Sequence, residues 1–458
     1  MRSHRWAAAV AVVTLLAALL IISRPTVGQQ KPVATAPATA PATQPHPDDL
    51  LPQDNDYVVH EWGTFTSFAG SDGVSLEFRS LAGADLPPFV LDRARQQTIH
   101  NRGAMISSLL KSDVRSRQRM ETPVTYFYTD KERIVDAVVE FPKGLLTEWY
   151  PPVRQFGPPI RKGQPEPLEA SWLRWGKIRL LPAAKAVDPK TGIDPLIPTI
   201  RRDDVLGEHY AHARATESAH VQLTDRGLTA PAREKFLFYR GVGNLDLPVS
   251  VKAAGGGRFV LTNSGKTPLR YAFVMQSFGG TVRFARYDSL AAQTTLTLPA
   301  DESNFSALGN EVVRALVSEG LFAKEAQAMV RTWEDQWFME PGTRVLYSLP
   351  QPETDRLLPL KLTPAPREML RVMIGRLELL TPEQERRVEK VTMNLSAGDP
   401  AARRAAADEL RAMGRFAEPA LARVAQVGSD PQAQSAAKAL LQESLLGKGV
   451  LAAPPTKQ

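Results

Sequence analysis

The sequence predicts a mostly β protein with a helical C-terminal part, which places the chain in the α+β class. Short runs of β-branched and aromatic residues, separated by Gly, Pro and Asn, follow one another from Asp56 to residue 300. Helical periodicity begins after Asn304, and an internal repeat lies near the C-terminus. Strands with almost no helical pattern between them favour antiparallel β-sandwich modules over βαβ units.

The first residues, 1–23, predict an export signal. Arg2 and Arg5 precede an uncharged apolar run of 17 residues, 6–22, which is the pattern of a signal peptide or a signal anchor. The run is at the lower limit for a membrane span, and Thr26-Val27-Gly28 offers only an offset cleavage site, so both forms stay open. A retained anchor would tether the protein to the inner membrane, with its body facing the periplasm. A cleaved signal would leave a periplasmic or secreted protein.

The composition limits the classes of partner. The formal charge is +7 at pH 7, but without Arg2, Arg5 and Arg24 the balance is 53 basic against 49 acidic residues. That surplus is too small to indicate nucleic acid. Cysteine is absent, which excludes disulfides, lipidated cysteines and thiolate zinc sites. No glycine-rich phosphate-binding motif opens a helix, so we expect no nucleotide either.

A linker and a β-rich domain follow the signal. Residues 24–54 repeat Ala-Thr-Pro units without apolar periodicity, which is typical of an extended, disordered spacer. The β-rich domain is predicted over 55–245. Its strand-length runs are YVVHEWGTFTSF (57–68), VTYFYTD (124–130), RIVDAVVEFP (133–142), KIRLLPA (177–183), HVQLTD (220–225) and KFLFYRGVG (235–243).

A second module is predicted over residues 246–385, as β-sandwich hairpins with a helical insertion at 305–338. The strongest hairpin signal is at 258–276, where Asn263-Ser264-Gly265 supplies turn residues between two apolar runs. In the insertion, apolar residues recur at helical spacing. The first stripe is Leu308, Val312 and Leu316, and the second is Ala326, Met329, Val330, Trp333 and Trp337.

The C-terminal part resembles HEAT-type helical repeats over residues 386–446. A capping box at 381–384, TPEQ, opens a helix. DPAARRAAADELRAMG from 399 and DPQAQSAAKALLQESL from 430 are 31 residues apart, so Ala406 superposes on Ala437 and Leu410 on Leu441. Fewer than two complete units cannot stand alone, so we expect them to dock on the preceding helices. Residues 447–458 are expected to be a disordered tail.

Several motifs in the same order carry a wider resemblance. They are HEWGTFTS (60–67), RMETPVTYFY (119–128), FPKGLLTEWYP (141–151), EKFLFYRGVG (234–243) and the stretch from KEAQAMVRTWEDQWF through RVLYSLP. Over roughly residues 55–385 the chain resembles a family of exported, uncharacterised bacterial proteins that open with a His-Glu-Trp-Gly-Thr motif. The resemblance implies shared architecture and export, and it assigns no activity, cofactor or substrate to any residue.

Four residues are candidate ligands of a transition metal. His60 and Glu61 offer an imidazole and a carboxylate, although neighbours in a regular strand point to opposite faces. His209 and His212 would share a helix face with His220 if residues 207–220 were helical, and a solvated loop would scatter them. The resembled family's pattern includes His209 but not His212 or His220. No other cofactor is predicted.

Four aromatic residues are candidate ligand-binding side chains. Trp149, Tyr150, Trp172 and Trp175 flank a long proline-rich stretch, 151–167, that also carries basic residues. Such rings could stack on sugars or on Pro-rich peptides. The alternative is that they anchor the loop to the core.

Three functional hypotheses follow. The first is an extracytoplasmic, membrane-tethered, non-catalytic binding or structural protein whose partner is an envelope protein or a glycan. The second is a metal-dependent hydrolase that uses His60, Glu61, His209 and His212. The third is a scaffold that recruits a partner through its helical tail, which predicts an exposed apolar groove on residues 399–445.

Overall fold

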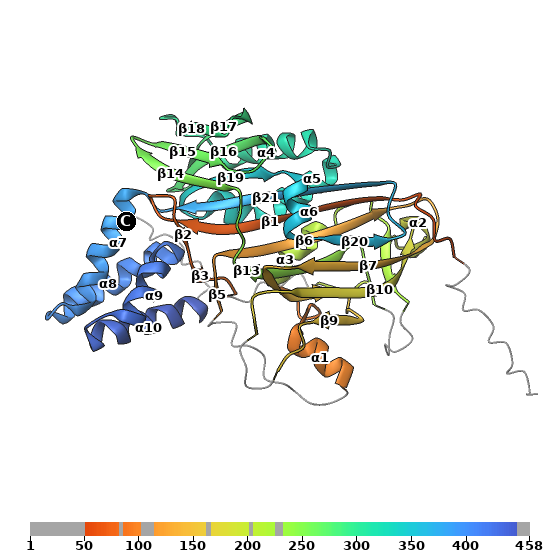
Figure 1. Cartoon of the computed structure of the whole chain (residues 1–458), viewed down its shortest axis with the longest axis horizontal. Coiled ribbons are helices and arrows are strands. Elements are labelled where there is room, and N and C mark those ends of the chain that lie inside the picture. The colour runs from red at the N-terminus through yellow and green to blue at the C-terminus, as the bar shows by residue number, and fades with distance from the viewer. Residues whose placement is uncertain are drawn as a thin grey trace, which may run out of the picture. The chain divides into compact units, whose positions relative to one another are not determined.

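The computed structural model describes residues 51–81, 86–101, 114–161, 166–200, 205–224 and 232–446. The predicted signal, most of the linker and the tail at 447–458 lie outside these residues. No helix in the described ranges is long and apolar enough to cross a membrane. The described chain is a mixed α/β protein with several sheets and a helical C-terminal part (Figure 1).

A ten-stranded sheet is built around β1 (Val58–Ala69). Along its whole length β1 pairs in parallel with β21 (Glu368–Leu379), and on its other side it pairs antiparallel with β6 (Gln118–Tyr128). The remaining strands are β2 (Ser75–Leu76), β4 (Leu91–Asp92), β8 (Gly144–Tyr150), β13 (Leu237–Gly243), β16 (Leu269–Phe278), β17 (Thr281–Leu290) and β19 (Gly342–Leu349).

This sheet corrects two expectations. It takes strands from both predicted modules, so the boundary between residues 245 and 246 does not separate two sheets. The β1–β21 pair is parallel, and the sheet is therefore not purely antiparallel. Strands that pair in parallel are usually buried on both faces of their sheet. β1 has this property, because almost every one of its residues is buried, including the polar ones. A bulge lies at Gly63, where a Cβ atom would meet Met373 and Pro123.

Three smaller sheets complete the strand body. The six-stranded sheet contains β7 (Arg133–Phe141), β9 (Gln155–Gly157), β10 (Ser171–Leu181), β11 (His220–Leu223), β12 (Arg233–Glu234) and β20 (Leu360–Thr363). The three-stranded sheet contains β14 (Val249–Gly255), β15 (Arg258–Asn263) and β18 (Gln293–Thr297), and β3 (Phe78–Arg79) pairs with β5 (Arg115–Ser116). Side chains of the ten-, six- and three-stranded sheets share one apolar core, to which Phe65, Val139 and Leu261 belong.

The hairpin expected at 258–276 does not form, because its two strands belong to different sheets. β15 pairs with β14 and β18, whereas β16 pairs with β17 and β19. The turn itself is present, since Gly265 N donates to Asn263 Oδ1 at 3.0 Å. It carries the chain from one sheet to the other instead of returning it alongside itself.

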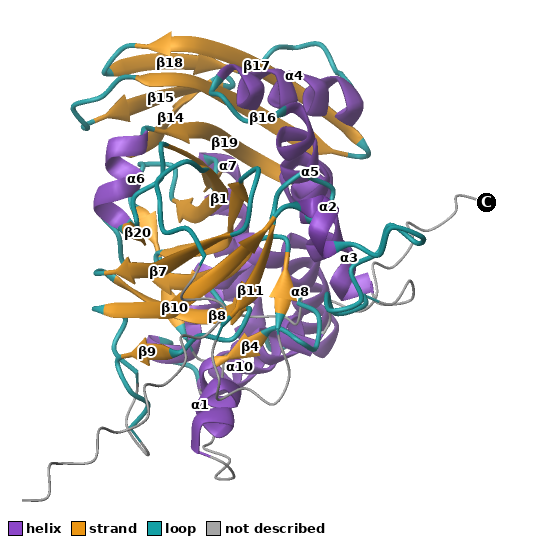
Figure 2. Ribbon diagram, turned by 90° about the vertical axis from the view of Figure 1, so that its right-hand side faces the viewer, coloured by secondary structure: helices purple, strands orange, loops and turns teal. Residues whose placement is uncertain are grey.

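Helices cover the face of the ten-stranded sheet that turns away from the six-stranded sheet (Figure 2). They are α3 (Val205–Ala213), α4 (Phe305–Ser318), α5 (Ala323–Glu334) and the π-helical turn Asp335–Met339. The predicted insertion at 305–338 is thus confirmed, and both of its predicted apolar stripes are buried. The other helices of the strand body are α1 (Arg93–Asn101), α2 (Ala183–Ala186) and α6 (Gln351–Leu357).

The C-terminal helices are α7 (Pro382–Met393), α8 (Pro400–Met413), α9 (Glu418–Val427) and α10 (Pro431–Leu446), with a 3₁₀ turn at Gly414–Ala417. The predicted capping box at Thr381 is confirmed: its side chain accepts from Gln384 N. Ala406, Leu410, Ala437 and Leu441, which the repeat aligns, are buried in one core cluster. These helices lie at the β2 and β3 end of the sheet (Figure 1), where Arg79 pairs with Glu418.

Candidate functional site

His60 and Glu61 point to opposite faces of the ten-stranded sheet, as the strand period predicts. His60 Nδ1 lies 2.8 Å from Glu325 Oε2 on α5, and Tyr128 Oη donates to Oε1 of the same carboxylate at 2.6 Å. The His60 ring also packs on Phe322, with ring centroids 4.5 Å apart. His60 therefore ties β1 to the helical layer.

Glu61 lies in the other core as part of a buried polar network. Its carboxylate accepts from Thr125 Oγ1 at 2.9 Å, from Tyr239 Oη at 2.5 Å and from Arg371 Nε at 2.7 Å. Burial opposes the charge on Arg371, but Glu61 holds the pKa of that guanidinium above its usual value. Burial and the nearby Glu61 charge raise the pKa of Tyr239. Both oxygens of the Glu61 carboxylate thus already accept hydrogen bonds within the fold.

The three histidines of residues 207–220 do not form one group. His209 and His212 share α3, whereas His220 is on β11. His209 Nδ1 lies 2.9 Å from the carbonyl oxygen of Thr332 on α5. Burial lowers the pKa of His212. His220 Nδ1 contacts Asp194 Oδ2 at 2.6 Å.

The candidate metal ligands do not converge. His60 contacts Glu325 and His209 contacts Thr332, seven residues further along α5, a separation of about 10 Å along a helix axis. Within the described ranges, no group of three or more His, Asp or Glu side chains is arranged to hold a metal ion.

The four candidate aromatic residues are mostly core residues, which corrects the prediction of a ligand platform. Trp149 Nε1 donates to Gln96 Oε1 at 2.8 Å, and Trp175 Nε1 donates to the carbonyl oxygen of Pro151 at 3.0 Å. Tyr150 is buried, and only Trp172 is half-buried. Trp175 thus anchors the proline-rich stretch directly, Trp149 shares Gln96 Oε1 with Val153 N of that stretch, and these four rings form no row that faces solvent.

An inner cavity of about 20 Å³ lies between the ten-stranded sheet, α3 and α5. It is lined by Leu86, Glu121, His209, Tyr210, Arg240, Thr332, Trp333 and Gln336. The charges around it are already paired: Glu121 Oε1 lies 3.1 Å from Arg119 Nε, and Arg240 Nε donates to Glu148 at 2.9 Å. A space of this size fits one water molecule. Glu121 of RMETP and Arg240 of FLFYRGVG thus line this cavity, and Thr66 of HEWGTFTS donates to Glu121 Oε2 at 2.6 Å.

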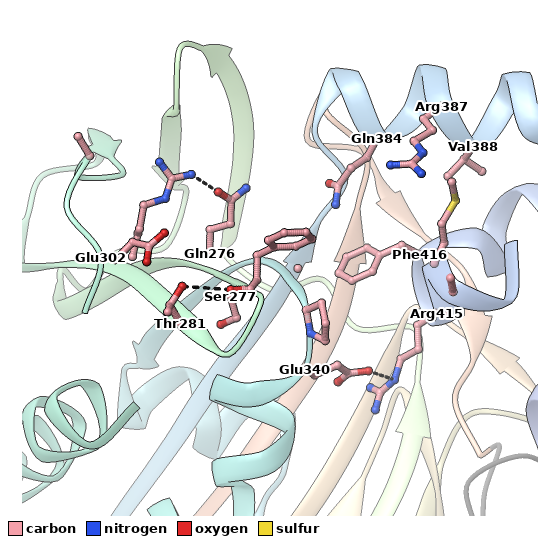
Figure 3. A pocket seen from close by; sticks show the side chains of 18 residues that line it. Gln276, Ser277, Thr281, Glu302, Glu340, Gln384, Arg387, Val388, Arg415 and Phe416 are labelled. Atoms are coloured by element: carbon pink, nitrogen blue, oxygen red, sulfur yellow. Dashed lines mark hydrogen bonds and ion pairs between the residues drawn. The ribbon is translucent and has the colours of Figure 1, made fainter. Parts of the chain in front are cut away.

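A larger and open cleft lies between the strand body and the C-terminal helices. We call it the junction cleft, and its volume is about 540 Å³. One wall is the β16–β17 hairpin with Gln276, Phe278 and Arg283, and the other is α7 and the 3₁₀ turn with Arg387 and Phe416. Figure 3 shows Gln276, Thr281 and Glu302 on one side of this space and Phe416, Gln384 and Arg387 on the other.

Phe278 is the most exposed large apolar side chain of the cleft, at 80% exposure. It pairs with Thr281 across a two-residue turn of Gly279 and Gly280, whose φ angles are 62° and 86°. Two positive φ angles define a tight hairpin turn that suits glycine. The turn holds the Phe278 ring at the tip of the hairpin, in the lining of the cleft.

Polar side chains with planar groups line the same cleft. Arg283 donates to the Gln276 side-chain oxygen, and Arg415 Nε lies 3.2 Å from Glu340 Oε1. Ser277 Oγ is buried and has no partner within the described residues. The cleft thus combines exposed aromatic surface with charges of both signs.

The sequence did not indicate this cleft, because its walls come from three distant segments. The Gly279-Gly280 pair was the one local signal, since it predicts a tight turn that displays Phe278. No protein-family model matches this chain, and no curated protein matches it.

Proposed function

We propose that the protein is a non-catalytic polysaccharide-binding protein of the cell envelope, which holds its ligand in the junction cleft. The observation that carries this proposal is the exposed Phe278 ring at the cleft, beside the planar polar groups of Gln276 and Arg283. A sugar ring has an apolar C–H face and a rim of hydroxyl groups. It therefore needs an aromatic surface together with hydrogen-bonding groups at its edge.

The charges of the cleft favour a neutral or mixed-charge glycan. Glu302 and Glu340 line the same cleft as Arg283, Arg387 and Arg415. Arg415 is already paired with Glu340, and Arg387 Nε is 2.6 Å from Glu409 Oε1. A strongly anionic polymer would need a surplus of uncompensated cations, and this cleft supplies too few.

The cellular setting enters as a proposal too. The apolar run at 6–22 and the resemblance to exported bacterial proteins support a membrane-tethered or periplasmic body. Cell-wall glycans are present in that compartment. We also propose that the six-stranded and ten-stranded sheets pack as a β-sandwich, which would give the Phe278 hairpin a rigid support.

The test is cosedimentation of the purified protein with insoluble glycans: peptidoglycan sacculi, chitin and cellulose. We expect saturable binding to at least one of them and about a fivefold loss of affinity in Phe278→Ala, because one aromatic contact contributes about 1 kcal/mol. Phe278→Tyr keeps the ring and is expected to keep the binding. Phe322→Ala removes another exposed ring and is the matched control. Equal binding by Phe278→Ala and the unaltered protein would sink the proposal.

A further inference from the structure

A second surface lies on the far side of Phe416, between α7 and α9. We call it the helical groove, and its volume is about 510 Å³. Its floor is apolar and includes Leu380, Val388, Ala420 and Val424. Two exposed apolar side chains continue this surface at the helix ends: Met393, which also lines the groove, is 65% exposed, and Val427, the last residue of α9, is 74% exposed.

The residues that line this groove distinguish it from the junction cleft. Val388 and Phe416 line both spaces, so they form the partition between them. The groove has no exposed aromatic ring in its lining, and small residues line it from α9, with Ala420, and from the start of α10, with Ala433. A trough with an apolar floor between two helices suits the apolar face of a third helix.

The charged residues on the α7 side of the groove indicate which kind of ligand it binds. Glu385 and Glu389 line the groove one turn apart, and Asp430 lies at its end. Glu385 accepts from Ser71 N at 2.8 Å, whereas the side chain of Glu389 is exposed to solvent. Arg423 is the single basic side chain of the lining. The groove is acidic on a chain whose net charge is +7.

We propose that the helical groove binds an amphipathic helix of a partner protein, with apolar side chains on the floor and Lys or Arg along the α7 wall. This interaction needs no glycan in the junction cleft. The two sites would hold different ligands, and together they would connect a polysaccharide to a protein of the envelope.

The probes are two synthetic 14-residue helices with the same leucine pattern, one with lysine and one with glutamate at every polar position. Fluorescence anisotropy with the full chain measures both affinities. We expect the leucine–lysine helix to bind at least tenfold more tightly. Non-specific attraction to a chain of charge +7 would favour the leucine–glutamate helix.

Two variants locate the binding. Glu389→Lys reverses an exposed charge and is expected to weaken the leucine–lysine helix about fivefold. Val424→Glu places a carboxylate on the floor and is expected to abolish the binding. Asp301→Lys makes the same charge change on an exposed loop and is the matched control. Because Val424→Glu can perturb the helices, Glu389→Lys keeps the test valid on a folded protein.

Equal affinities for the two helices, or binding that survives both variants, would overturn the proposal. Concentration-dependent dimerisation that Glu389→Lys abolishes would also overturn it, since the occupant would then be a second copy of this chain. Loss of glycan binding in Phe278→Ala leaves these results unchanged, so a failure of the two proposals can be told apart.

Discussion

The ring of Phe416 packs edge-on against the ring of Phe68, with centroids 5.9 Å apart. Phe68 belongs to β1 and Phe416 to the turn between α8 and α9, so this contact joins the central strand to the C-terminal helices. Phe78 and Leu380 complete the small cluster. Both candidate binding surfaces have Phe416 in their lining, and their shape therefore depends on this contact.

Phe416→Ala is expected to lower the free energy of unfolding by about 3–4 kcal/mol, because it empties a buried aromatic position. Urea denaturation followed by circular dichroism measures the loss. Val427→Ala, at a highly exposed apolar position, serves as the control and is expected to change little. A loss below 1 kcal/mol in Phe416→Ala would show that the helices are held by other contacts.

Removal of the buried charge at Glu61 is expected to lower the free energy of unfolding by about 3–5 kcal/mol, because Arg371 would stay buried without its main partner. The test is urea denaturation of Glu61→Gln, Arg371→Met and the double variant. We expect the double variant to be more stable than either single one. Simple additivity of the two losses would contradict a direct pairing.

The stability of the protein is expected to fall between pH 7 and pH 5 through His220. Burial lowers the pKa of His220, although Asp194 accepts from its ring. The unfolded chain, with a histidine pKa of about 6.5, therefore binds this proton more readily than the folded protein. Protonation would also place an N–H at Nε2, which is buried without a partner among the described residues.

The measurement is the free energy of unfolding at pH 5, 6 and 7 for the unaltered chain and for His220→Asn. We expect the variant to show the shallower decline. His212, whose pKa burial also lowers, stays in both proteins and accounts for the remaining slope. Parallel declines would contradict a role for His220.

Metal content separates the binding hypothesis from the hydrolase alternative that uses His60, Glu61, His209 and His212. Inductively coupled plasma mass spectrometry of the protein, prepared without a histidine tag, is expected to find less than about 0.1 transition-metal ion per chain. A stoichiometric metal that is lost in His209→Ala would contradict that expectation and support the hydrolase.

Local patterns predicted the elements of this fold better than their partners. The strand period placed His60 and Glu61 on opposite faces, and the capping box located the start of α7. The parallel partner of β1, by contrast, is β21, which lies more than 300 residues away. Their parallel pairing accompanies burial of both strand faces, which local patterns do not show. The turn at Asn263 was recognised, but the pairing of β15 depends on strands outside that turn.

The candidate sites were harder to predict for the same reason. Trp149 and Trp175 carry polar N–H groups that the core satisfies, so composition could not separate a platform from an anchor. The junction cleft forms only where α7 and the turn at Phe416 meet the β16–β17 hairpin. The cleft thus depends on tertiary contacts between distant segments, and the spacing of residues within one segment does not predict such contacts.

Hydrogen–deuterium exchange in the presence of a soluble fragment of the bound glycan tests polysaccharide binding most directly. We expect slower exchange at residues 276–283 and 412–416, the two walls of the junction cleft, and weaker protection of the same segments in Phe278→Ala at the same glycan concentration. Protection confined to other segments, such as the proline-rich stretch near Trp172, or no protection at all, would contradict it.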